Sequence, residues 1–124
     1  MTQAAQKQTQ STNPLNDLSA LLSADMCEVN ALILDHMRSD VPRIPQLVGY
    51  LISAGGKRIR PLLTLACARL FGYEGTRPYG LAAAVEFIHT ATLLHDDVVD
   101  ESIQRRGKDA ANVVFGNQAS VLVG

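Results

Sequence analysis

The sequence is organised around residues 87–101, FIHTATLLHDDVVDE, where an apolar helical pattern runs into a cluster of acids. In an α-helix successive residues are about 100° apart, so Asp96 and Asp100 project from one face, about 40° apart and one turn along. Asp97 lies to the side of that face. Like charges at this spacing destabilise an isolated helix, so the cluster needs an explanation.

Two explanations fit the acids of residues 87–101. Carboxylate oxygens gathered at one helix end suit Mg²⁺ that is shared with substrate phosphates. A solvated, acid-rich helix end is the alternative, because acids most often lie on protein surfaces. This stretch by itself leaves both open.

Composition indicates a single globular unit in a reducing compartment. The 124 residues are 47% hydrophobic and 19% charged, with a formal net charge of −1. This balance provides no basic stripe for nucleic acid. Cys27 and Cys67 have no metal-binding spacing, and we expect both to be small buried thiols of a cytoplasmic protein. The longest nearly apolar run, residues 78–95, contains Glu86 and two histidines, so we expect a core helix rather than a transmembrane segment.

The rest of the sequence predicts an all-α fold, a helical bundle. Residues 1–14 are polar and predict a flexible tail before a domain over 15–124. Helical periodicity predicts helices over 15–38, about 45–53, 62–71, from 78 to the acids, and from 110 onward. We expect residues 102–108 to form a loop. The last predicted helix is uncapped at Gly124, so we expect the sequence to be an incomplete, truncated domain.

A second charged motif, GGKRIRP, occupies residues 55–61. Its glycines free the backbone, three cations follow, and Pro61 suits the first turn of a helix. Backbone donors, helix dipole and cations together favour a phosphate, although a solvated charged loop is the alternative. With the acids at 96–100 and the cations Arg105 and Arg106, the pattern describes a diphosphate site with bridging Mg²⁺.

Four motifs in order resemble those of the trans-isoprenyl diphosphate synthases: GGKRIRP, FIHT, LLHDDVVD and RRG. The resemblance covers roughly residues 26–124, and among the family the chain looks most like the octaprenyl diphosphate synthases, which make quinone side chains. It implies a bundle of the isoprenoid synthase type, Mg²⁺ as cofactor, and a homodimer for the full-length protein. The substrates would be isopentenyl diphosphate and an allylic prenyl diphosphate, without a nucleic-acid partner.

The resemblance assigns Lys57 and Arg60 to the diphosphate of isopentenyl diphosphate, with His89 and Arg106 completing that pocket. An isolated histidine in an apolar helix is more often a core residue. His89, however, lies seven residues before Asp96, about two turns, and therefore on nearly the same face.

The resemblance assigns Asp96 and Asp100, supported by Asp97, to Mg²⁺ on the allylic diphosphate, and Arg105 to that diphosphate. An allylic cation would form, the double bond of isopentenyl diphosphate would attack it, and a proton would be lost. The family carries a second aspartate-rich motif that this sequence does not contain. We therefore expect residues 1–124 to be the amino-terminal part of the enzyme and inactive alone.

Ala91 and Thr92 are candidates for control of product length. Thr92 lies one turn before Asp96, so a tail anchored at Asp96 would pass these positions. Short-chain members of the family tend to carry bulky aromatics there, and the small residues here imply a long product. Close helix packing is the alternative use of small residues.

Two other function classes remain open from the sequence. A metal-dependent phosphohydrolase of the HD type also places His and Asp on helices, but the interval between His89 and His95 is too short for it. A non-catalytic partner that regulates a related synthase by helix docking is the second. Such a partner could lose acids or cations, whereas this sequence retains each of the motifs above.

Overall fold

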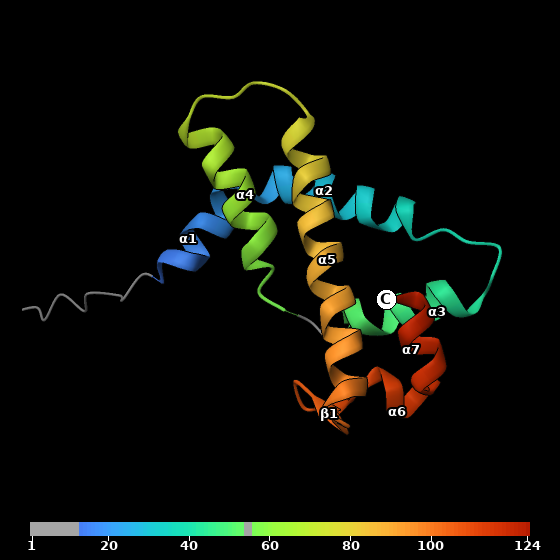
Figure 1. Cartoon of the computed structure of the whole chain (residues 1–124). Coiled ribbons are helices and arrows are strands. Elements are labelled where there is room, and N and C mark those ends of the chain that lie inside the picture. The colour runs from blue at the N-terminus through green and yellow to red at the C-terminus, as the bar shows by residue number, and fades with distance from the viewer. Residues whose placement is uncertain (1–12, 54–55) are drawn as a thin grey trace, which may run out of the picture.

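The protein is described by a computed structural model that covers residues 13–53 and 56–124 (Figure 1). Most of the predicted tail, residues 1–12, and Gly55 of the glycine pair lie outside this range. The elements are α1 (Pro14–Leu21), α2 (Ser23–His36), α3 (Arg43–Ser53), α4 (Ile59–Leu70), α5 (Arg77–Val99), β1 (Gln104–Arg105), β2 (Lys108–Asp109), α6 (Ala111–Phe115) and α7 (Asn117–Val123). The predicted all-α class is confirmed.

Helix α5 is the axis of the molecule, and α2, α4, α6 and α7 all contact it (Figure 1). It begins after Thr76 with Pro78 in its first turn, where a missing backbone N–H costs nothing. Its 23 residues give a length of about 35 Å. Among the described helices, none combines the length and apolar content that a lipid bilayer requires.

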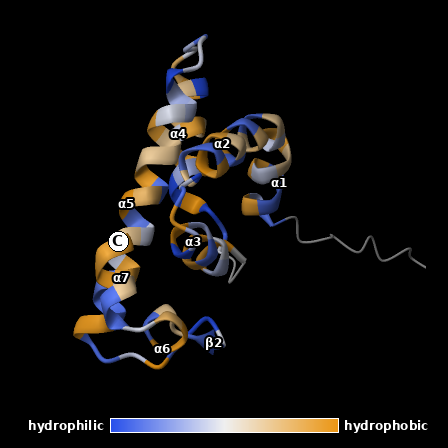
Figure 2. Cartoon of the chain, turned by 90° about the vertical axis from the view of Figure 1, so that its right-hand side faces the viewer, coloured by the Kyte–Doolittle hydropathy of each residue, from blue (hydrophilic) through white to orange (hydrophobic). Residues whose placement is uncertain are grey.

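Two separate apolar clusters hold the helices to α5. The larger cluster joins α2, α4 and α5, where Ala82 and Ala83 are small enough for close helix approach. The smaller cluster joins α3, α5 and α6 through Leu47, Leu94 and Ala111. Figure 2 shows hydrophobic segments along α6 and α7 as well as among the upper helices. The second cluster therefore fixes the end of α5 that carries the acids.

A polar cluster around the buried Asp25 ties the opposite end of α5 to α2 and α4. Asp25, only 7% exposed, accepts hydrogen bonds from Arg69 Nε at 2.8 Å and from the Tyr79 hydroxyl at 2.9 Å. Arg69 Nη2 completes the fork at 2.6 Å. Because the phenol donates to a carboxylate, the pKa of Tyr79 is raised. One buried charge is thus satisfied by partners from two other helices.

Three predicted segments differ from the structure. The helix expected over 15–38 is two helices, because the chain turns at Leu22, whose side chain is 1% exposed in the larger cluster. The final helix is broken by Gly116 at φ 90°, in the left-handed half of the map. Residues 102–108, expected to be a loop, contain β1 and the start of β2. Strands of two residues are too short to show an alternating pattern.

The prediction that Cys27 and Cys67 are buried is wrong, since both are exposed. Each lies on a helix that buries only one stripe, and the cysteines fall outside that stripe. Phe71 is 85% exposed just after the end of α4, although its side chain is large and apolar. Leu94, by contrast, is buried.

Candidate functional site

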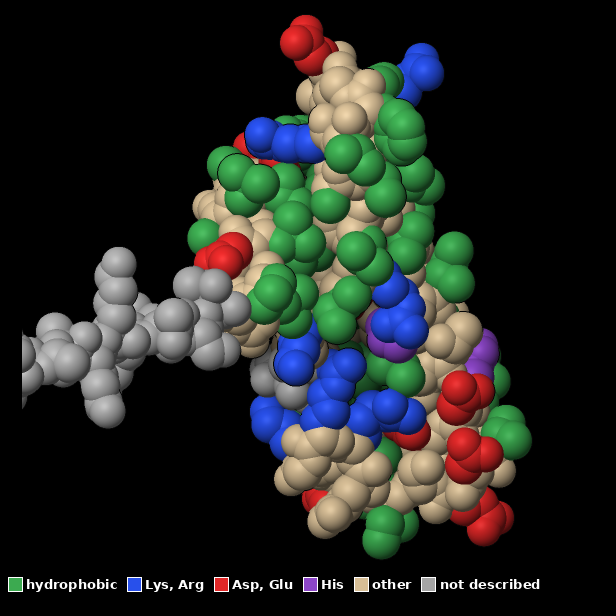
Figure 3. All heavy atoms as spheres, turned by 90° about the vertical axis from the view of Figure 1, so that its left-hand side faces the viewer, with side chains coloured by type: hydrophobic (Ala, Val, Ile, Leu, Met, Phe, Trp, Pro, Cys, Tyr) green, Lys and Arg blue, Asp and Glu red, His purple; other side chains and the backbone are tan. Residues whose placement is uncertain are grey.

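Cationic side chains from three parts of the chain line one pocket. The α3–α4 connection with the start of α4, α5, and the β1–β2 hairpin contribute its lining residues: Gly56, Lys57, Arg58, Ile59, Arg60, Glu86, His89 and Arg106. Figure 3 shows Lys and Arg side chains gathered on one face beside a His, with acidic side chains along the edge of that face. Residues far apart in sequence therefore converge on a site suited to an anion.

Arg60 and His89 are in direct contact across the pocket. Arg60 Nη1 lies 3.2 Å from His89 Nε2. Because guanidinium is always protonated, it must donate, so Nε2 accepts and the imidazole is neutral. Partial burial lowers the pKa of His89, and the nearby Arg60 cation lowers it further. His89 thus enters the site as a neutral group that keeps Arg60 in place.

Lys57 and Arg58 have different surroundings although they are neighbours. Arg58 adopts φ 50° at the N-cap of α4, and its Nη1 donates to Asn30 on α2. Lys57 is exposed, and no hydrogen bond or ion pair joins it to any other described residue. Lys57 is therefore available to a ligand, whereas Arg58 attaches the loop to α2.

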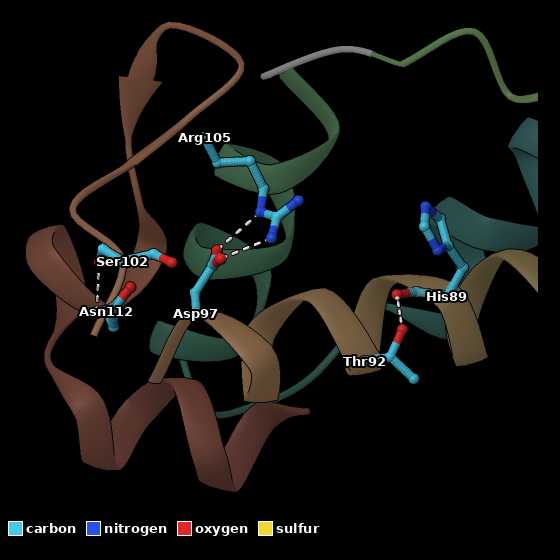
Figure 4. A network of polar contacts seen from close by, with 6 residues as sticks. All are labelled: His89, Thr92, Asp97, Ser102, Arg105 and Asn112. Carbon is cyan, nitrogen blue, oxygen red and sulfur yellow. Dashed lines mark hydrogen bonds and ion pairs between the residues drawn. The ribbon is translucent and has the colours of Figure 1, made fainter. Parts of the chain in front are cut away.

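The three aspartates near the end of α5 also differ from one another. Asp96 and Asp100 are exposed, and within the described residues neither has a hydrogen-bonded or ionic side-chain partner. Asp97 is 2% exposed, and Arg105 donates to both of its oxygens, from Nε at 2.8 Å and Nη2 at 2.6 Å (Figure 4). These hydrogen bonds raise the pKa of Arg105. Asp97 therefore acts in an ion pair within the chain.

The carboxylates of Asp96 and Asp100 fit a magnesium ion that is held jointly with a substrate. The backbone N–H of Asp100 donates to the Asp96 carbonyl at 2.8 Å, so the two side chains lie one helical turn apart. Over the described part of the chain, no group of three His, Cys, Asp or Glu side chains forms a metal site. Mg²⁺ commonly takes one or two carboxylates plus phosphates and waters, which matches this donor set.

Helix α5 ends in a Schellman motif that directs the chain back toward the pocket. Ser102 N donates to the Asp97 carbonyl at 2.9 Å and Glu101 N to the Val98 carbonyl at 3.3 Å. Glu101 occupies the left-handed position, φ 53°, where glycine is usual. The side chain of Asn112 secures the following loop by donating to the Ser102 carbonyl at 3.1 Å (Figure 4).

The hairpin that follows covers one side of the pocket. Its strands pair Gln104 with Asp109 and Arg105 with Lys108, and the two residues between have φ values of 51° and 76°. Positive φ at both positions is typical of a type I′ turn. The turn places the Arg106 guanidinium over Gly56, where a Cβ atom would lie 2.5 Å from Nη1. A glycine at residue 56 therefore permits this close approach.

Ala91 and Thr92 have different environments on α5. Thr92 is exposed, as Asp96 is, and its hydroxyl donates to the His89 carbonyl at 2.6 Å (Figure 4). Ala91 is half-buried. Thr92 is thus the residue of the two that shares the open side of the acids, and a role for either in product length stays a prediction.

Sequence reasoning missed Glu86 and Tyr50 as site residues. Glu86 lines the cationic pocket, and it also lines an adjoining cavity of about 60 Å³ with Tyr50 and apolar residues from α2, α3 and α5. Glu86 precedes His89 by three residues, a spacing that could have placed it on the same face. Tyr50 donates its hydroxyl to the Asp109 carbonyl, a contact to the hairpin that no local pattern reveals.

The sequence and the fold are similar to those of known proteins. The chain is 58% identical over 110 residues to an octaprenyl diphosphate synthase of Escherichia coli, covering 89% of this chain and 34% of that protein. A crystal structure of a decaprenyl diphosphate synthase from Rhodobacter capsulatus matches 89% of this chain and 34% of its own, with 60% identity and a TM-score of 0.87.

A second solved structure is a polyprenyl synthase from Caulobacter crescentus, complexed with calcium and isoprenyl diphosphate. It matches with 60% identity and a TM-score of 0.85, over 88% of this chain and 33% of its own. The chain thus spans about a third of the length of these relatives. The family model described as polyprenyl synthetase matches residues 41–124. The converging cations, the paired carboxylates and these similarities together show that the chain belongs to the polyprenyl synthetase family.

Proposed function

We propose that this protein is a Mg²⁺-dependent trans-polyprenyl diphosphate synthase, which condenses isopentenyl diphosphate with an allylic prenyl diphosphate. The product would be a long all-trans chain of the octaprenyl class, for quinone side chains. The observation that carries the proposal is the position of a cationic pocket and of two carboxylates, which have no side-chain partner within the described residues, along one helix, α5. The enzyme would act in the cytoplasm as a homodimer.

The cationic pocket would hold isopentenyl diphosphate. Lys57 has no partner among the described residues, and within the same residues His89 is the one hydrogen-bond partner of the Arg60 guanidinium. Arg106 reaches the same pocket from the hairpin, over Gly56. Three cations around one diphosphate neutralise its negative charge and fix its orientation.

The carboxylates of Asp96 and Asp100 would hold the allylic diphosphate through Mg²⁺. When bound, the ion would stabilise the negative charge that develops on the departing pyrophosphate. In the reaction the allylic C–O bond breaks, a new C–C bond forms to isopentenyl diphosphate, and one proton leaves. Fixed charges aimed at the leaving group supply the catalytic effect, so no side-chain nucleophile is required.

A chimera tests this proposal. This chain would replace the segment of the Escherichia coli octaprenyl diphosphate synthase to which it aligns, at 58% identity. We expect Mg²⁺-dependent formation of octaprenyl-class diphosphate from isopentenyl diphosphate and an allylic starter, measured by chromatography of radiolabelled products. A folded chimera that elongates no allylic substrate would overturn the proposal. Release of inorganic phosphate without chain growth would indicate a hydrolase instead.

A further inference from the structure

The pair formed by Asp97 and Arg105 separates Asp97 from its two acidic neighbours. Both Asp97 oxygens accept from the Arg105 fork, and the Asp97 side chain is only 3% exposed. A carboxylate engaged in this way has little surface left for a shared metal ion. Asp96 and Asp100, in contrast, are exposed on the same helix.

The same pair attaches the hairpin to α5. Arg105 belongs to β1, and Arg106, the next residue, begins the tight turn at φ 51°. A residue in the left-handed region is held there only by surrounding contacts, since the conformation itself is unfavourable. The Arg105 fork to Asp97 is one such contact, one residue before the turn, beside the strand pairing of Arg105 with Lys108. A change at Asp97 should therefore reach the Arg106 guanidinium above Gly56.

We propose that Asp97 is a positioning residue of the cationic pocket, which acts through Arg105 and the hairpin to place Arg106 on a bound diphosphate, and is not a metal ligand. This inference rests on the proposed function, because it assumes that the pocket receives a diphosphate. It assigns the three aspartates two separate tasks, metal binding for Asp96 and Asp100 and hairpin placement for Asp97.

The test uses this chain and inorganic pyrophosphate without Mg²⁺, so that the carboxylates of the metal site take no part. Calorimetry would compare the native chain with Asp97→Asn, Arg106→Gln and the double variant. We expect each single variant to weaken binding about tenfold and the double variant to be no weaker than Arg106→Gln, because coupled residues are not additive. Independent, additive losses would overturn the proposal.

Asp25→Asn is the matched control for a general loss of stability. Asp25 is also buried and also accepts the fork of an arginine, Arg69, but at the far end of α5. We expect this variant to lower the melting temperature as Asp97→Asn does while leaving pyrophosphate affinity unchanged. Equal affinity losses in both variants would show that Asp97 has only a structural role and would overturn the proposal.

A second variant covers the case in which Asp97→Asn does not fold. Arg105→Lys retains the positive charge, but a lysine cannot form the bidentate hydrogen bond to Asp97. We expect weaker pyrophosphate binding and faster amide exchange at Ala110, whose N–H closes the hairpin onto Ile103 at 2.9 Å. If Asp97→Asn binds pyrophosphate as the native chain does without Mg²⁺ and loses only the binding that depends on Mg²⁺, Asp97 is a metal ligand and the proposal is overturned. If pyrophosphate binds as expected but the chimera elongates nothing, the proposed function fails and the positioning role remains.

Discussion

At the scale of single residues, environment rather than identity distinguishes the aspartates of α5. Asp96 and Asp100 face solvent, and we expect them to be required for turnover. In the chimera, Asp96→Asn or Asp100→Asn should lower kcat by about 10²–10³-fold, the loss typical for one preorganised charge-stabilising group. The measurement is steady-state kinetics over a range of Mg²⁺ concentrations.

The control for these variants is Glu101→Gln, an acid-to-amide change at the same helix end. Glu101 is exposed, and no described residue forms a hydrogen bond or ion pair with its side chain. Its kcat should stay within about twofold of the parent chimera, because a surface side chain without a partner among the described residues has small effects when it is changed. Activity close to that of the parent in Asp96→Asn or Asp100→Asn would refute the metal assignment.

His89 provides a pH-dependent test of the cationic pocket. Its pKa lies below the ordinary value of 6.5, first because of burial and then because of Arg60. Arg60→Gln should raise this pKa without restoring it fully, since burial remains. The measurement is an NMR titration of the His89 imidazole, with Arg38→Gln as the control. Arg38 lies outside the pocket, 3.6 Å from Asp35, and its loss should leave the pKa of His89 unchanged.

The lowered pKa of His89 also has a consequence for stability. Just below pH 6.5 the His89 imidazole is protonated in the unfolded chain but still neutral in the folded chain. The contribution of His89 to the free energy of unfolding is therefore complete above pH 6.5 and falls as the pH drops through the lowered value. In His89→Gln, chemical unfolding between pH 5 and 7 should show a weaker pH dependence (the range follows from the ordinary histidine pKa). An unchanged dependence would contradict the neutral imidazole.

At this scale, local spacing predicted part of the geometry. The seven-residue interval placed His89 in line with the acids, and in the structure His89 lies 3.2 Å from Arg60, while the binding role of each residue stays a prediction. The partner of Asp97 could not be inferred, because it depends on a hairpin that folds the chain back by eight residues. In the sequence Asp96, Asp97 and Asp100 look alike, and only their contacts in the folded chain distinguish them.

At the scale of elements, the short hairpin is the feature that sequence reasoning missed. Its turn depends on Gly107, whose φ of 76° is strained for any side chain with a Cβ. Gly107→Ala should destabilise the chain by about 1 kcal/mol or more. Gly80→Ala, in the exposed interior of α5 with nothing within 4 Å of a new Cβ, should instead stabilise it by up to about 1 kcal/mol. Urea unfolding measures both, and changes of the same sign would contradict the turn.

The length of the product is a property of helix α5. If the allylic tail passes the open side of the helix below Asp96, a ring at residue 92 should obstruct it. In the chimera, Thr92→Phe should shorten the product while the first condensation continues, because the reacting centre lies about one turn away. Ala91→Phe should shorten it less, since Ala91 is half-buried and Thr92 is exposed. Products of unchanged length from both variants would place the tail along another face.

At the scale of the whole molecule, much apolar surface is exposed in the described chain. The exposed large side chains include Leu70 at 79%, Phe71 at 85%, Val99 at 80% and Leu122 at 85%. Surface of this kind favours association, because burying it removes it from water. We therefore expect residues 1–124 to self-associate. Size-exclusion chromatography over a range of concentrations tests this, and a cooperatively melting monomer would contradict it.

The overall arrangement was predictable where patterns are long and not where they are short. Helix periodicity over many residues predicted the bundle and the position of α5 to within about one residue at its start. The turn at Leu22 was hidden, because the apolar pattern continues across it and only tertiary packing decides the break. The exposed Cys67 and Phe71 show the same limit, since hydrophobic identity alone does not reveal which residues are buried.

One continuous helix carries both the pocket histidine and the carboxylates, and this constrains evolution in a particular way. From His89 to Asp96 the helix advances about 10.5 Å and completes nearly two turns. Replacing a residue in this interval leaves that spacing intact. One inserted residue would rotate the carboxylates by about 100° around the helix axis relative to His89. Point substitutions can therefore accumulate between the two positions, but insertions and deletions cannot. The gene should preserve the number of residues here more strictly than their identity.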